Sequence, residues 1–217
     1  MNLLKKLTVP LCGFLFANPL LFGTPGYERG EWTRPLMGTV FHIIVYSPAG
    51  SKAEESAFKA FELIERLENT LSYYQEESEL NRLARVGFEE TVTVSPDLYQ
   101  VLEASLHWSR ETGGAFDCTL RPLINLWRRR GEEGLMVSPA EIEEARKRIG
   151  YDKVLINRRL RSVRLLAPGM MLDLGGIAKG FAADRAFESL RNDGFRIILI
   201  DAGGDIRVGD PPPSLGG

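Results

Sequence analysis

The chain has 217 residues, of which 44% are hydrophobic and 26% charged, and its formal net charge is −2. This composition is typical of a globular protein with enough apolar side chains for one core. Acidic and basic residues are mixed along the sequence, so nothing in the charge favours a nucleic-acid-binding protein. The densest basic run, residues 128–130, is followed at once by Glu132 and Glu133, and we expect a solvated helix end or loop there.

The N-terminal segment differs from the rest of the chain. Lys5 and Lys6 precede the mostly apolar residues 7–22, an arrangement that resembles a secretory signal. The apolar run is short and contains two prolines, which disfavours a membrane-spanning helix. Lipidation at Cys12 is an alternative, but it is not favoured because a leucine precedes this cysteine where a lipoprotein signal has a small residue. We therefore predict a signal-like segment at residues 1–26 and an exported protein, either periplasmic or attached to the outer face of the inner membrane.

Cys118 is the single cysteine that remains if such a signal is removed, which excludes an internal disulfide. A lone thiol is either a nucleophile or a small, half-buried residue, and we favour the second because no histidine lies near it in sequence. His42 and His107 fall in a predicted strand and a predicted helix, and neither has an acid and a nucleophile at a recognisable spacing. A serine or cysteine hydrolase is therefore poorly supported.

The first predicted element is a strand at residues 39–46, which are rich in β-branched and aromatic side chains. Apolar residues recur at helical spacing over 51–71 and predict an amphipathic helix. Ser95 directly before Pro96 predicts the capped start of another helix. We expect that helix to end at the glycine pair 113–114.

The second half of the chain opens with a capping-box pattern at residues 138–141, and its helix is expected to end near Gly150. Helices and neighbouring strands mix along the chain, so we predict an α+β fold: a mixed sheet with packed helices, in one domain over residues 27–217. The further predicted elements are paired strands at 153–156 and 163–166, a helix at 177–191, a buried-type strand at 196–200 and, after a Gly-Gly turn, a hairpin strand at 206–208.

Two glycine-rich turns flank the helix predicted at residues 177–191. In the first turn, Asp173 comes just ahead of the pair Gly175 and Gly176, and Lys179 follows in the first helical turn. Such a segment can offer backbone N–H groups, a carboxylate and an ammonium to one phosphate-bearing ligand. Its spacing is neither that of a Walker loop nor that of a Rossmann fingerprint. The alternative, an aspartate cap with a solvent-facing lysine, stays open.

Three other segments have side chains that suit a flat ligand. Ala115, Phe116 and Asp117 follow the glycine pair 113–114 and could place an aromatic face and a carboxylate at a site, although such a pair is more often only a helix end. The tyrosines at 73–74 could stack on a heterocycle, although tyrosines are more often half-buried core residues. The third segment is Met-Gly-Thr at 37–39.

Taken in order along the chain, these segments resemble the FAD:protein FMN transferases, also called the ApbE family. The resemblance covers about residues 32–209. It implies an enzyme that uses FAD as substrate and Mg²⁺ as activator, attaches FMN through a phosphoester to a threonine or serine of a partner protein, and releases AMP. The implied acceptor is a flavoprotein, typically a membrane redox subunit. The matching segments are residues 37–39, 71–81, 112–117, 121–127, 172–180 and 203–207.

The resemblance also implies individual roles. Gly176 matches a position whose backbone carbonyl is a metal ligand. Mg²⁺ would neutralise the pyrophosphate, and Lys179 would add positive charge at the developing anion. No residue of the chain is assigned a catalytic role. The residues implied to contact FAD are Met37, Tyr74, Ala115, Phe116, Asp117, Asp173 and Lys179.

Members of the family are longer, and their second half carries a candidate base and side-chain metal ligands that these 217 residues lack. We therefore expect the chain to be the N-terminal part of such an enzyme, with a fold that is incomplete at the C-terminus. Two alternatives remain open. One is a flavin-binding or assembly protein without transferase activity, and the other is an inactive fragment.

Overall fold

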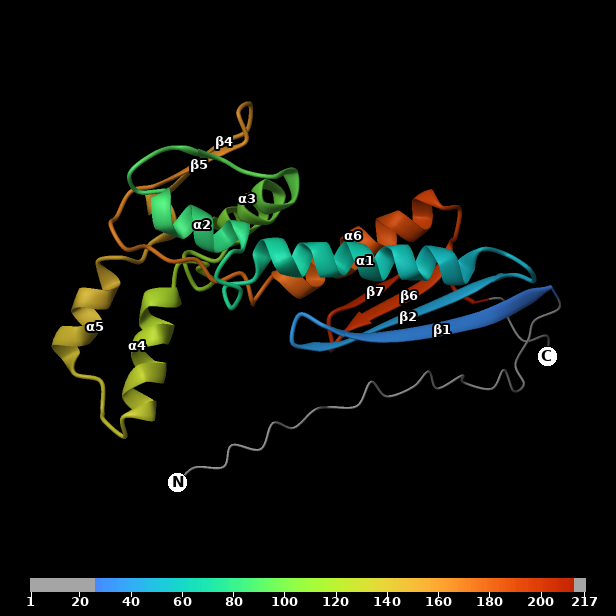
Figure 1. Ribbon diagram of the computed structural model, residues 1–217, viewed down its shortest axis with the longest axis horizontal. Coiled ribbons are helices and arrows are strands. Elements are labelled where there is room, and N and C mark those ends of the chain that lie inside the picture. Colours follow the sequence, from blue (N-terminus) through green and yellow to red (C-terminus); the bar gives the residue numbers. More distant parts are fainter. Residues whose placement is uncertain (1–25, 213–217) are drawn as a thin grey trace, which may run out of the picture.

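Four strands form the larger of two sheets in the computed structural model, which describes residues 26–212 (Figure 1). They lie in the order β1, β2, β6, β7, and each pairs antiparallel with its neighbour. The pairing of β2 with β6 joins segments from opposite ends of the described chain. The bounds are Tyr27–Leu36 for β1, Thr39–Pro48 for β2, Ile197–Ala202 for β6 and Ile206–Val208 for β7.

Two helices that pack on each other, α1 (Ala53–Leu71) and α6 (Ala178–Asn192), cover one face of this sheet (Figure 1). Successive residues of a strand point to opposite faces, so Phe41, Ile43 and Val45 of β2 share one face, and all three are fully buried. Burying a side chain of this size contributes roughly 1.5–3 kcal/mol. The core therefore lies between the sheet and the two helices.

A smaller sheet lies beyond one end of α1, next to α2 and α3 (Figure 1). Its three strands are antiparallel in the order β3, β5, β4. Ser95 begins α3 by accepting a hydrogen bond from the Leu98 N–H at 3.2 Å. The bounds are Glu79–Val86 for α2, Val92–Thr93 for β3, Pro96–Glu111 for α3, Val154–Asn157 for β4 and Ser162–Leu165 for β5, with a short 3₁₀ helix at Tyr151–Lys153.

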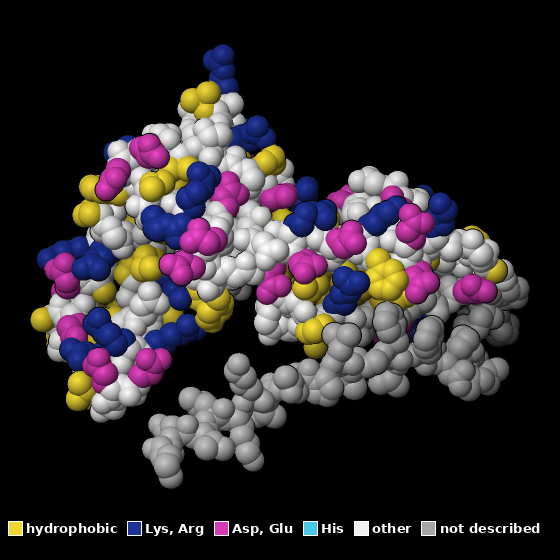
Figure 2. Space-filling model, in the orientation of Figure 1, with side chains coloured by type: hydrophobic (Ala, Val, Ile, Leu, Met, Phe, Trp, Pro, Cys, Tyr) yellow, Lys and Arg dark blue, Asp and Glu magenta, His cyan; other side chains and the backbone are white. Residues whose placement is uncertain are grey.

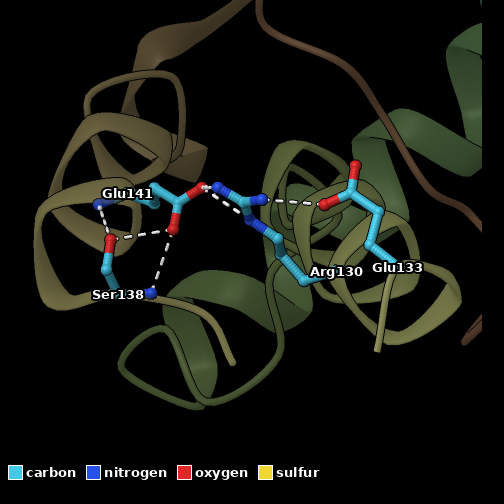
Figure 3. Close-up of polar contacts among 4 residues, drawn as sticks. All are labelled: Arg130, Glu133, Ser138 and Glu141. Atoms are coloured by element: carbon cyan, nitrogen blue, oxygen red, sulfur yellow. Dashed lines mark hydrogen bonds and ion pairs between the residues drawn. The ribbon is translucent and has the colours of Figure 1, made fainter. Parts of the chain in front are cut away.

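The helices α4 (Arg121–Glu132) and α5 (Pro139–Arg146) form a pair beside the smaller sheet (Figure 1). Arg130 of α4 lies between Glu133 and Glu141, with its Nε 2.8 Å from Glu141 Oε1 (Figure 3). Glu141 also closes the predicted capping box, since its carboxylate accepts the backbone N–H of Ser138 at 3.0 Å. One carboxylate thus caps α5 and links it to α4. The basic run at 128–130 lies near the end of a helix, as expected, but Arg130 is paired and half-buried rather than solvated.

The predicted α+β fold is confirmed, and both predicted strand pairs, 153–156 with 163–166 and the hairpin at 206–208, are present. Three expectations were wrong in detail. The pairings among the described strands are all antiparallel rather than mixed. The helix α5 ends at Arg146, well before Gly150. The strand β6 is fully buried on one face only, because the sheet carries helices on that face.

Five elements of the described chain were not predicted: β1, β3, α2, α4 and the 3₁₀ helix at Tyr151–Lys153. The strand β1 is an edge strand, and its sequence contains a glycine, a proline and several charged residues, which an exposed edge tolerates. The strand β3 has only two residues. The helices α2 and α4 are short and mostly polar, and each buries only two side chains, so the apolar positions that mark a helix in sequence are few.

Charged side chains of both signs are interspersed over the face of the molecule shown in Figure 2. Among residues 26–212, no helix is both long enough and apolar enough to cross a bilayer. The predicted signal-like segment lies outside the described residues, apart from its last residue.

Candidate functional site

The loop before α6 is organised around Asp173. Its Oδ1 accepts the backbone N–H of Gly175 at 2.8 Å, and its own N–H donates to the carbonyl of Cys118 at 2.7 Å. The helix itself begins at Ala178 without a side-chain cap. Asp173 therefore closes a tight turn and does not cap the helix, so the alternative of an aspartate cap was wrong, and the second carboxylate oxygen, Oδ2, accepts no hydrogen bond within this turn.

The backbone hydrogen bond to Cys118 brings the predicted segment 115–117 against this loop. A Cβ built on Gly176 would lie 3.2 Å from Cε2 of Phe116, so the aromatic ring lies directly against the glycine. Phe116 is half-buried, whereas Ala115 is exposed. The structure thus brings together Phe116, Gly176 and Asp173, three of the residues that the sequence predicts for the site.

Asp117 has a structural role in the same region. Its Oδ1 accepts both the backbone N–H and the hydroxyl of Thr119, at 2.8 and 2.7 Å, and its Oδ2 accepts the backbone N–H of Tyr151 at 3.1 Å. These bonds tie the segment after α3 to the 3₁₀ helix before β4. They occupy both carboxylate oxygens with partners from the chain itself.

Two arginines of α4 contact a pair of adjacent tyrosines whose rings are tilted by 38° to each other. The rings of Tyr73 and Tyr74 lie 4.0 Å apart between centroids. The guanidinium carbon of Arg121 lies 3.3 Å from the Tyr73 ring centroid, and Arg128 Nη2 donates to the Tyr74 hydroxyl at 3.1 Å. A hydrogen bond with the Tyr73 hydroxyl lowers the pKa of Tyr74, and the hydrogen bond from Arg128 lowers it further. The Tyr74 side chain itself is 71% exposed and so presents an aromatic surface to solvent.

Arg121 joins this tyrosine pair to the loop before α6, because its Nη1 lies 3.5 Å from Asp173 Oδ2. The sequence analysis quoted Arg121 within a family segment but gave it no role. No local signal reveals it, since its partners Tyr73 and Asp173 are far from it in sequence and become neighbours only in the fold. The predicted residues Tyr74, Phe116, Asp173 and Gly176 thus form one contact network, which we call the Asp173 cluster.

Lys179 and Met37 lie in a second group around two tight turns. Lys179 Nζ, in the first turn of α6, lies 3.3 Å from Asp205 Oδ2 in the turn between β6 and β7. Gly203 in that turn contacts Thr39, since a Cβ there would lie 2.0 Å from the Thr39 Oγ1. Thr39 begins β2, and Met37 lies just before it in the two-residue turn between β1 and β2, where the Met37 backbone has a φ of +51°. Asp173 and Lys179 therefore have separate partners, and the backbone between them connects the two groups.

Two surface pockets of the described residues lie elsewhere. One, of about 430 Å³, is lined by residues near the start of α1 and the end of α6. The other, of about 470 Å³, lies between α4 and α5 and is lined in part by Arg129, Arg148 and Met171. None of the residues predicted to contact FAD lines either pocket.

The remaining candidates for chemistry are explained by the fold. Cys118 is 1% exposed, rather than half-buried, and burial raises the pKa of its thiol to about 12, which does not suit a nucleophile. His107 is exposed on α3, and His42 is half-buried in β2. Within residues 26–212 no three histidine, cysteine, aspartate or glutamate side chains gather in a way that could hold a metal ion.

Comparison with known proteins supports the resemblance seen in the sequence. The sequence profile of the ApbE family matches residues 37–215. The FAD:protein FMN transferase of Treponema pallidum is 31% identical over 186 residues, and that of Klebsiella pneumoniae is 34% identical over 179 residues. The alignments cover 83% and 82% of this chain but 51% and 55% of those proteins, so the chain spans about half the length of the curated relatives it matches.

Solved structures of ApbE proteins have the same fold as this chain. The flavin transferase ApbE from Vibrio cholerae superposes with a TM-score of 0.75 at 25% identity, over 84% of this chain and 60% of that one. The ApbE protein from Thermotoga maritima gives a TM-score of 0.73 at 32% identity, over 83% and 59% of the two chains. The family profile alone covers more than half of the sequence. The chain belongs to the ApbE family.

Proposed function

We propose that this chain carries the flavin-binding part of an FAD:protein FMN transferase, which moves FMN from FAD to a hydroxyl of an acceptor protein and releases AMP. The observation that carries the proposal is the Asp173 cluster. It collects an exposed aromatic ring, a half-buried one, a carboxylate and a glycine-rich helix start from segments that are far apart in sequence. Family membership supports the same reading.

Each side chain has a chemical role in this proposal. The Asp173 carboxylate suits the hydroxyl groups of a ribose or the N–H donors of an adenine, because its Oδ2 accepts no hydrogen bond from the described residues and has only the Arg121 guanidinium 3.5 Å away. Tyr74 and Phe116 offer aromatic faces to a flat ring system. Lys179 is 34% exposed and offers a point charge to a phosphate next to the N-terminus of α6. Met37 and Ala115 would add apolar contacts.

The resemblance also implies Mg²⁺, with the Gly176 carbonyl as one ligand. Magnesium binds near-octahedrally to oxygen atoms and usually keeps several waters. The residues described here do not by themselves make such a site, since no group of acidic side chains among them could hold a metal ion.

The acceptor and the location complete the proposal. FMN transfer needs a threonine or serine hydroxyl of a partner protein, and we propose an exported flavoprotein or membrane redox subunit as that partner. Two lysines followed by an apolar run at the N-terminus support an exported enzyme, in the periplasm or at the outer face of the inner membrane.

The experiment that tests the function uses the 217-residue chain with FAD, Mg²⁺ and an acceptor flavoprotein that carries a threonine site. AMP release and flavin fluorescence on the acceptor are measured together. An acceptor with alanine in place of the threonine is the control for specific attachment, and Asp173→Asn is the control for the site. Product on the threonine acceptor alone supports transfer. FAD binding without AMP release favours the flavin-binding alternative, and absence of FAD binding contradicts both.

A further inference from the structure

We propose that Arg121 is a positioning residue of the flavin site, which holds the Asp173 carboxylate in the orientation that receives FAD and is itself held by the ring of Tyr73. The inference rests on the proposed function and deepens it, because it adds a residue to the site. The Arg121 side chain is only 12% exposed and lies beside the Asp173 carboxylate, whose side chain is 15% exposed.

The Asp173 carboxylate is held at both of its oxygens. Oδ1 accepts the N–H of Gly175 at 2.8 Å, and Oδ2 lies 3.5 Å from Arg121 Nη1. The first contact fixes the carboxylate to its own turn, and the second opposes rotation of Oδ2 away from α4. A carboxylate that must accept hydrogen bonds from a ligand loses less freedom on binding if its plane is already fixed.

Arg121 is fixed in turn by an aromatic face rather than by hydrogen bonds. Its guanidinium carbon lies 3.3 Å from the Tyr73 ring centroid, a stacked contact that suits a planar cation. Its Nη1 is buried and has no hydrogen-bond partner among the described residues. A buried charged donor without a hydrogen bond is costly, so the stack and the nearby carboxylate must offset that cost.

Burial of Nη1 also decides how Arg121 can act. That nitrogen is closed off from solvent, so it does not present itself to a ligand, whereas Tyr74 does, at 71% exposure. Arg128 stands two helical turns later on the same face of α4 and donates to the Tyr74 hydroxyl. On one helix face, therefore, both arginines contact the tyrosine pair, and Arg121 also contacts the Asp173 carboxylate.

The test is a double-mutant cycle on FAD affinity, measured by flavin fluorescence titration of the full chain. Arg121→Gln is expected to weaken FAD binding about tenfold in the unaltered background, the size of one lost partly buried ionic contact. In an Asp173→Asn background the same substitution is expected to change affinity by about twofold or less, since two residues that act as one unit are not additive. Arg129→Gln, an exposed neighbour on α4, is the matched control and should leave FAD affinity unchanged.

A purely structural role would give a different result. If Arg121 only stabilised the fold, its loss would weaken FAD binding equally in both backgrounds, and that additivity would overturn the inference. An unchanged affinity for Arg121→Gln or for Asp173→Asn would also overturn it. If Arg121→Gln does not fold, as judged by circular dichroism, Arg121→Lys is run in the same cycle; it keeps the charge but not the stacked plane, and a smaller, equally non-additive loss is expected. Absence of FAD binding by the unaltered chain would overturn the proposed function and the inference with it.

Discussion

Lys179 Nζ lies 3.3 Å from Asp205 Oδ2, and this ion pair ties the first turn of α6 to the turn between β6 and β7. Both side chains are partly exposed, so the pair contributes little to stability. This partly exposed partner holds Lys179 beside the helix N-terminus, and in the proposed site the lysine would exchange it for a phosphate. The ion pair fixes the position of Lys179, and its weakness leaves the ammonium group able to change partner.

Replacing this lysine should affect binding more than folding. Lys179→Gln is expected to weaken FAD binding about tenfold at low salt, because one phosphate contact is lost, and the difference should shrink as salt screens the charge. FAD titrations at two salt concentrations measure it. Lys59→Gln, which removes an exposed, paired lysine on α1, is the control. An equal loss for both variants would mean that overall charge, not this position, matters.

The contact between Gly176 and Phe116 gives a second prediction. Gly176→Ala adds a Cβ that would lie 3.2 Å from the Phe116 ring, so the ring or the loop must shift by a few tenths of an ångström. We expect FAD binding to weaken several-fold, with a loss of stability of about 1 kcal/mol. Gly131→Ala is the matched control, because its Cβ would meet no atom within 4 Å. FAD affinity and thermal unfolding of both variants test this, and unchanged affinity for Gly176→Ala would show that the contact is not part of the site.

The capping box of α5 predicts a pH dependence of stability. The backbone N–H and hydroxyl of Ser138, together with Arg130, lower the pKa of Glu141 from its ordinary value of 4.5 to about 2. A carboxyl with a lowered pKa in the folded state stabilises the protein above its unfolded pKa and loses that effect as the pH falls through its folded pKa. Glu141→Gln should therefore unfold at a lower temperature than the parent at pH 7, and the difference should shrink between about pH 4.5 and pH 2.

Thermal unfolding of both proteins across that pH range measures the effect. Glu143→Gln, on the same helix with only an exposed partner, is the control and should stay close to the parent throughout. A difference for Glu141→Gln that stays constant down to pH 2 would contradict the assignment of this carboxylate.

Cys118 should be chemically silent in the folded protein. Burial raises the pKa of its thiol to about 12, so at pH 8 it is protonated as well as inaccessible. In a Cys12→Ser background, which leaves Cys118 as the single thiol, a disulfide reagent such as DTNB should label none of the native protein and all of it in denaturant. Rapid labelling of the native protein would contradict this prediction and would make Cys118 a candidate nucleophile again.

Much of the fold was readable from local patterns. The capped starts of α3 and α5, the long amphipathic α1 and the last hairpin all depend on neighbours within a few residues, and each was predicted. The strand β1 was missed because its stability comes from pairing with β2 rather than from an apolar pattern of its own. The site was predicted residue by residue from the family resemblance, and those FAD contacts stay predictions.

The sequence by itself determined most of the longer elements, the family and the residue types offered to a ligand, because helix periodicity, caps and motifs act over short distances along the chain. Only the tertiary structure decided which of those residues meet. It placed Phe116 against Gly176, and it gave Asp173 and Lys179 separate partners in Arg121 and Asp205. Contacts of this kind join segments that are remote in sequence, and the packing of α4 and the two sheets, which no local pattern encodes, sets their geometry.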